Sequence, residues 1–111
     1  MAKFMLLFQG KEFDPTDESE ETTEYAQKWG EWMAKLTMEG FMESGAPLEW
    51  SGKVIEKDAI RDYQLREVDD GGYMILNASS MEEAANIAKG APNVDLGGQV
   101  VIRPIIEIPG E

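Results

Sequence analysis

The fold is decided by three consecutive stretches, GGYMILNA (residues 71–78), SSMEEAANIAKGAP (79–92) and GGQVVIRPIIEI (97–108), which predict a strand, a helix and a second strand. Tyr73 and Ile75 lie on one face of the first strand. Met74 and Leu76, on its other face, are equally apolar. An antiparallel sheet with one face in water would show a polar residue at every second position. The pattern therefore predicts a sheet that needs cover on both faces.

The helix between these strands has clear boundaries. Ser79 and Ser80 are candidate N-caps, and acidic residues follow three positions later, as in a capping box. Gly90 ends the helix, and Pro92 follows where a helix cannot continue. The apolar stripe at helical spacing consists of Met81, Ala84, Ala85, Ile87 and Ala88. Because most of these side chains are small, we expect the helix to lie close to the sheet.

The first part of the chain predicts another strand and a long helix. Residues 3–9 (KFMLLFQ) are apolar on both faces, which suits a central strand. Ser19 is the favoured cap of a helix that runs to about Glu39, with Gly40 as its stop signal. One face of this helix carries a heavy aromatic stripe at steps of three and four, formed by Tyr25, Trp29, Trp32, Met33 and Leu36.

The middle of the chain is less regular. We expect residues 43–50 to form a loop, and residues 54–56 and 60–67 to form two short strands around a turn at residues 57–58. The second of these strands is the most polar in the chain, so we place it at a sheet edge.

This order predicts an α+β fold, a ferredoxin-like β-α-β-β-α-β arrangement with an extra hairpin strand, in a single domain over residues 1–111. Both helices would cover one face of the antiparallel sheet. The other face is also apolar, and a second copy of the chain is its simplest cover. We therefore expect a homodimer formed through the open sheet face.

Composition removes several classes of function. The chain has 22 acidic and 10 basic residues, a net charge of -12, and this charge opposes binding to nucleic acid or an anionic membrane. It has no cysteine and no histidine, which excludes thiolate nucleophiles, histidine bases and sulfur or imidazole metal ligands. We expect no metal and no cofactor. We also expect a cytoplasmic protein, because the sequence has no membrane-spanning run or signal peptide.

The sequence resembles the YCII-related family, in its DGPF-type branch, within the dimeric α+β barrel superfamily. The resemblance lies in KFMLLFQG, WGEWMAKLTMEG, GGYMILNASSMEEAANIAKGAP and GGQVVIRPII, which together cover most of the chain. It implies a dimeric barrel whose relatives include cofactor-free monooxygenases, isomerases and haem-degrading enzymes. It also implies a possible regulatory link, because genes of this type often lie beside alternative sigma factors.

The chain departs from the family where that branch carries Asp-Gly-Pro-Phe followed by an acid and a lysine. This chain reads IRDYQLREVDDGG there, so only Asp62 and Glu67 can stand for the family's acids. They are the candidate catalytic carboxylates. Asp69 and Asp70 could also supply a base or bind a hard cation, although the Asp-Asp-Gly-Gly sequence is first of all typical of a turn. The histidine–aspartate pair proposed for the other YCII branch has no counterpart here.

The candidate ligand-binding residues are mostly aromatic: Trp29, Trp32, Trp50, Tyr63 and Tyr73. They could line an apolar pocket, or the tryptophans could simply pack in the core. Arg103 stands in an otherwise apolar strand, where it could anchor a ligand carboxylate, pair with an acid on a neighbouring strand such as Glu67 or Asp62, or lie at the dimer interface.

Three classes of function stay open. The first is a small-molecule-binding or otherwise non-catalytic dimeric domain. The second is a cofactor-free isomerase, lyase or monooxygenase that uses Asp62 or Glu67 as its base. The third is an accessory protein that acts through protein partners.

Overall fold

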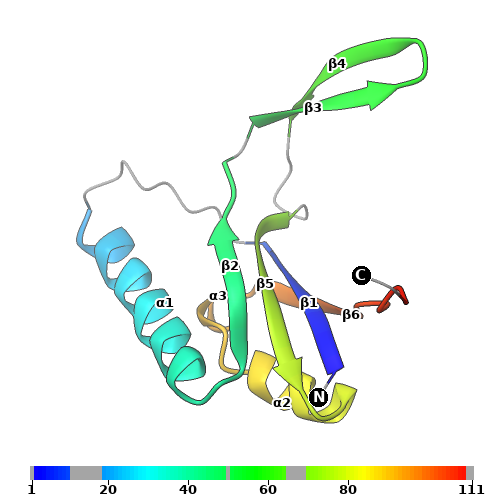
Figure 1. The fold of residues 1–111 in the computed structure, drawn as a ribbon. Helices are drawn as coiled ribbons and strands as arrows, with labels where there is room; N and C mark the ends of the chain where they lie inside the picture. The colour runs from blue at the N-terminus through cyan, green and yellow to red at the C-terminus, as the bar shows by residue number, and fades with distance from the viewer. Residues whose placement is uncertain (1, 11–18, 50, 65–69, 110–111) are drawn as a thin grey trace.

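The computed structural model describes residues 2–10, 19–49, 51–64 and 70–109. Among these residues, strands and helices follow one another largely in the order that the sequence predicts (Figure 1). The elements are β1 (Ala2–Gln9), α1 (Glu20–Met38), β2 (Met42–Pro47), β3 (Ser51–Glu56), β4 (Ala59–Gln64), β5 (Asp70–Ala78), α2 (Met81–Ala88), α3 (Pro92–Asp95) and β6 (Gln99–Pro104).

Four of the strands form one antiparallel sheet in the order β2-β5-β1-β6. β1 is central, and its Leu6 lies opposite Met74 of β5 on one side and Ile102 of β6 on the other. The first and last strands of the chain are therefore neighbours. This α+β arrangement is consistent with the expected ferredoxin-like fold.

The predicted helix boundaries are confirmed at both long helices. Ser19 caps α1, where its Oγ accepts a hydrogen bond from the Thr22 backbone N–H at 3.2 Å. Ser80 caps α2 in the same way, and the Glu83 carboxylate accepts in return from the Ser79 N–H at 2.8 Å. Each cap satisfies backbone donors that a helix start leaves unpaired.

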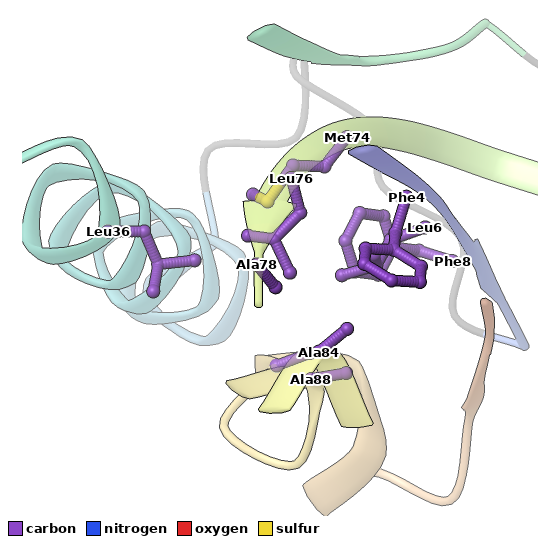
Figure 2. Packing of buried hydrophobic residues seen from close by; sticks show 10 residues of the cluster. Phe4, Leu6, Phe8, Leu36, Met74, Leu76, Ala78, Ala84 and Ala88 are labelled. Carbon is purple, nitrogen blue, oxygen red and sulfur yellow. The ribbon is translucent and has the colours of Figure 1, made fainter. Parts of the chain in front are cut away.

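The core lies between the sheet and the two long helices (Figure 2). Alternate residues of β1 and β5 point toward it, because side chains of a strand alternate between faces. Leu36 of α1 and Ala84 and Ala88 of α2 cover these side chains. The buried sheet residues are Phe4, Leu6, Phe8, Met74, Leu76 and Ala78.

The opposite face of the sheet carries a second apolar surface, which we call the open face. Its centre consists of Met5, Leu7, Tyr73, Ile75 and Val101, all partly exposed. Polar side chains border this surface. Lys3 forms an ion pair with Glu43 at 2.8 Å, and the Gln99 side-chain amide donates a hydrogen bond to the Gln9 side chain. No described helix packs on this face. The prediction that the sheet is apolar on both faces is thus confirmed for these strands.

The prediction of a loop at residues 43–50 is wrong, because Met42–Pro47 forms the edge strand β2. Its Ser-Gly-Ala-Pro sequence is a weak strand signal, but pairing with β5 outweighs local preference. Gly45 allows this pairing, since a Cβ there would lie only 2.8 Å from the Tyr73 carbonyl oxygen. Pro47 is tolerated because it lies on an edge strand.

The expected hairpin forms, but β3 and β4 pair with each other in a separate two-stranded sheet. Figure 1 shows this hairpin standing apart from the main sheet. The ion pairs Lys53–Asp62 and Arg61–Glu56 link its strands, and Ile55 and Ile60 are opposite each other and largely exposed. The expected strand end at residues 65–67 lies outside the described residues.

Two glycine substitutions test the role of backbone geometry. Gly30→Ala in α1 should raise the free energy of unfolding by about 1 kcal/mol, because alanine is the better helix former and its Cβ would meet nothing within 4 Å. Gly45→Ala should lower it by about 1–3 kcal/mol, because β2 must move away from β5. Urea denaturation of both variants measures the difference; equal midpoints would contradict this account of β2.

Candidate functional site

A partly open cavity lies between α1 and one end of the sheet. Its volume is about 180 Å³. The walls come from α1, β1, β5 and α3, and the side chains that define them include Phe8, Tyr25, Trp29, Met33 and Asn93. Tyr73 of β5 also borders the cavity, although strand alternation places its side chain on the open face. Pro47 and Gly71, where the chain leaves and re-enters the main sheet around the hairpin, line the cavity as well.

One wall is a set of aromatic rings packed edge to face. Trp29 lies 4.8 Å from Phe8 and 6.2 Å from Tyr25, measured between ring centroids. Trp32 continues the set at 5.6 Å from Trp29. The interplanar angles are between 75° and 87°, the T-shaped geometry that aromatic pairs favour. The three- and four-residue spacing on α1 places these rings on one side of the helix.

Tyr25 brings a polar group to this wall. Burial raises the pKa of its hydroxyl, and a hydrogen bond with the Trp29 side chain partly offsets that rise. The indole N–H can only donate, so the tyrosine oxygen accepts this bond. The hydroxyl therefore stays protonated to a higher pH than an ordinary tyrosine, and its oxygen already accepts a hydrogen bond from Trp29.

Asn93 brings the second polar group, and only 2% of it is exposed. Its side-chain Nδ2 donates to the backbone carbonyls of Gln9 and Gln99, each at 3.0 Å. The amide thus ties α3 to the end of β1 and the start of β6. Its Oδ1 is buried and has no hydrogen-bond partner among the described residues.

Gly98 makes this arrangement possible. A Cβ at that position would lie 2.5 Å from the Gln9 carbonyl oxygen and 2.9 Å from the Asn93 carbonyl oxygen. Both contacts are with backbone atoms, so a side chain could not be accommodated by a small shift. The Gly-Gly pair before β6 therefore serves close backbone packing beside the cavity.

The structure brings together only some of the sequence-predicted ligand residues. Trp29 and Tyr73 line the cavity. Trp32 packs against Trp29 but lines a neighbouring groove between α1 and α2. Tyr63 lies on the hairpin, opposite Gly52, and Arg103 lies exposed on β6. Trp50 lies outside the described residues.

The candidate carboxylates are not in the described part of the cavity wall. Asp62 lies on β4 with 80% of its side chain exposed, and it pairs with Lys53. Asp70, at the start of β5, accepts a hydrogen bond from Gln9 Nε2 at 2.7 Å. Glu67 and Asp69 fall outside the described residues. The described lining residues include no aspartate, glutamate, lysine or arginine.

The groove between α1 and α2 is larger, about 580 Å³, but more open. Lys35, Glu39, Glu82 and Glu83 contribute to its rim. Hydrated charges around an open groove hold a small ligand less well than an enclosed apolar site. We therefore take the smaller cavity as the candidate site.

Asn93 is the cavity residue that sequence reasoning missed. It stands in APNVDLGG, a stretch to which the sequence analysis assigns no site. Pro92 at the start of α3 marks a helix beginning, but no local pattern predicts that the next side chain is buried.

The described residues show no metal site, because nowhere among them do three or more possible ligands come together. Among the described helices, none has the length and apolarity needed to cross a membrane.

Comparison with known proteins relates the chain to others through its fold. No family model matches the sequence, and no curated protein matches it. Among solved structures, the chain is similar to the 5-chloro-2-hydroxyhydroquinone dehydrochlorinase of Burkholderia phenoliruptrix in complex with 2,5-dihydroxybenzoquinone, with a TM-score of 0.57 and 14% sequence identity. The match covers 95% of this chain and 94% of that one.

At this identity the likeness shows a shared fold. The superfamily, the YCII-related family and its DGPF-type branch stay predictions from the sequence.

The buried Tyr25 hydroxyl should make the protein sensitive to alkali. Because the folded-state pKa is raised, its contribution to stability is complete below the ordinary tyrosine pKa of about 10 and is lost as pH rises through the higher folded value. Tyr25→Phe should lose less stability than the wild type above about pH 10. Urea denaturation at several alkaline pH values measures this, and identical pH slopes would contradict it.

Proposed function

We propose that this protein binds a small, neutral aromatic molecule in the cavity between α1 and the sheet. The observation that carries the proposal is a partly open cavity that has an aromatic wall and no charged side chain among its described lining residues. A volume of about 180 Å³ suits a single ring, since an engineered cavity of about 150 Å³ in another protein takes up benzene. The similar dehydrochlorinase, complexed with a single-ring quinone, supports a ligand of this size.

We favour binding over catalysis by a carboxylate. A carboxylate becomes a useful base at neutral pH when burial raises its pKa, whereas Asp62 is exposed and ion-paired with Lys53. The enzymatic activity of the similar structure keeps a cofactor-free enzyme as the second candidate.

The proposed role includes assembly into a homodimer of the dimeric α+β barrel type, in the DGPF-type branch that the sequence resembles. The open face supports this, because its apolar centre is bordered by polar side chains, the usual anatomy of an interface. Two copies related by a two-fold axis would present the same surface to each other. A second sheet would then cover Met5, Leu7 and Val101.

Filling the cavity tests the binding site. Ala26→Leu places extra volume in the lining, whereas Ala34→Leu makes the same change at an exposed position of the same helix outside the lining. We expect Ala26→Leu to weaken binding of para-fluorophenol at least about tenfold and Ala34→Leu to leave it unchanged, since steric exclusion acts only at the site. Fluorine NMR titration measures the affinities. Equal binding by both variants would place the ligand elsewhere.

A charge on the open face tests the dimer. Val101→Asp would bury an unpaired carboxylate between the sheets and should yield monomer or insoluble protein. Met38→Asp, at the end of α1 on the helix-covered side of the sheet and 88% exposed, is the control and should leave assembly unchanged. Light scattering at micromolar concentration gives the molar mass. A stable wild-type monomer would refute the proposed interface.

A further inference from the structure

The β3–β4 hairpin (residues 51–64) has little cover from its own chain. It forms a separate two-stranded sheet, and Figure 1 shows it projecting beyond the end of the main sheet. The radius of gyration is 15.4 Å, whereas a domain of this length typically has a value of about 13 Å. An isolated two-stranded hairpin is at best marginally stable in water. The hairpin therefore lacks a surface to pack against within the described chain.

The exposed isoleucines of the described chain occur at two places, the hairpin and the segment after β6, which we call the tail (residues 105–109). Ile55 and Ile60 lie opposite each other near the hairpin turn. Ile106 and Ile108 lie in the tail, and all four side chains are between 62% and 85% exposed. Single exposed apolar side chains are ordinary, but a group of them indicates an interaction surface.

The hairpin and the tail leave the main sheet at opposite ends. The hairpin follows Pro47 of β2, which lies opposite Gly72, and Gly72 lies opposite Phe8 near the end of β1. The tail begins beside the start of β1, where the Ile105 N–H donates to the Lys3 carbonyl at 2.9 Å. Phe8 and Lys3 are separated by about 17 Å along the strand. Figure 1 shows the hairpin clear of the tail of its own chain.

The direction of the hairpin points to a second copy of the chain. Figure 1 shows the hairpin leaning away from α1, which covers the core side of the sheet. The hairpin therefore leans toward the side of the open face. In the proposed homodimer, the second sheet lies on this side.

Charge favours the same occupant. The hairpin carries three basic and three acidic residues and is neutral, so the rest of the chain carries the whole net charge of -12. Because two acidic chains repel each other, a neutral segment is the part of one chain that approaches the other most easily. The charged hairpin residues are Lys53, Glu56, Lys57, Asp58, Arg61 and Asp62.

The symmetry of the dimer decides what the hairpin meets. When two sheets face each other, a two-fold axis across the strands reverses their direction and places the hairpin end of one sheet over the tail end of the other. This arrangement brings the two groups of exposed isoleucines together. We propose that Ile55 and Ile60 of each chain pack on the tail of the partner subunit, at Ile106 and Ile108, an inference that rests on the homodimer of the proposed function.

Engineered disulfides test this contact, because the chain has no cysteine. We expect the double variant Ile60→Cys/Ile106→Cys to form a covalent dimer under mild oxidation with glutathione disulfide. Met38 is as exposed as Ile106 but lies at the end of α1, on the helix-covered side of the sheet. The matched control Ile60→Cys/Met38→Cys should therefore stay uncross-linked. Non-reducing electrophoresis separates covalent dimer from monomer.

A second pair of variants measures what the hairpin contributes to assembly. Ile60→Ser removes apolar area from two contacts in each dimer and should raise the dimer dissociation constant at least about tenfold. Lys57→Ser, at the hairpin turn, should leave this constant unchanged. Sedimentation velocity over a dilution series measures both.

The outcomes separate this inference from the proposed homodimer. An intrachain disulfide in the double variant would mean that the hairpin packs on its own tail, and a covalent dimer of Ile60→Cys alone would mean that hairpin meets hairpin. Either result overturns the inference, as does equal cross-linking of the Met38 control. An unchanged dissociation constant in Ile60→Ser also overturns it, while the homodimer through the open face stands. If the wild-type protein is a monomer, the homodimer itself fails, and this inference fails with it.

Discussion

The structure depends on a central strand that is apolar on both faces. β1 pairs with β5 and β6, so its backbone is satisfied on both sides and its side chains must find cover above and below. Phe4, Leu6 and Phe8 are covered within the chain by the two long helices. Met5 and Leu7 on the other face are covered by none of the described helices. The described helices of one chain therefore cover only one face of its sheet, and the open face is left for a second layer to cover.

The same strand connects the core to the candidate site. Phe8, the last core residue of β1, packs against Trp29 in the cavity wall, and the carbonyl of the next residue, Gln9, accepts a hydrogen bond from Asn93. The glycines near this point, Gly10 and Gly98, allow backbones to approach where side chains would collide. The cavity is therefore formed where the packing of β1 ends, and its polar group is anchored to the sheet rather than to a loop.

The sequence predicts those features that depend on local chemistry. Helix caps and stops were recognised because Ser19, Ser80 and Gly40 each satisfy a requirement of their immediate neighbours. β2 was missed because its residues form a strand only beside β5. Asn93 was missed for the same reason, since its side chain bonds to Gln9, far away in sequence, and to Gln99 at the start of β6. Burial of a polar side chain is a tertiary property, and no spacing rule anticipates it.

The sequence also left open whether the tryptophans of α1 are core residues or pocket walls, and the structure shows that for Trp29 these are not alternatives. Its ring packs against the buried Phe8 and also lines the cavity. The two long helices and the sheet are separated by a single layer of side chains. A large ring at the edge of this layer therefore contacts both the core and the cavity. A cavity wall built from core residues is held rigid by the same packing that stabilises the fold.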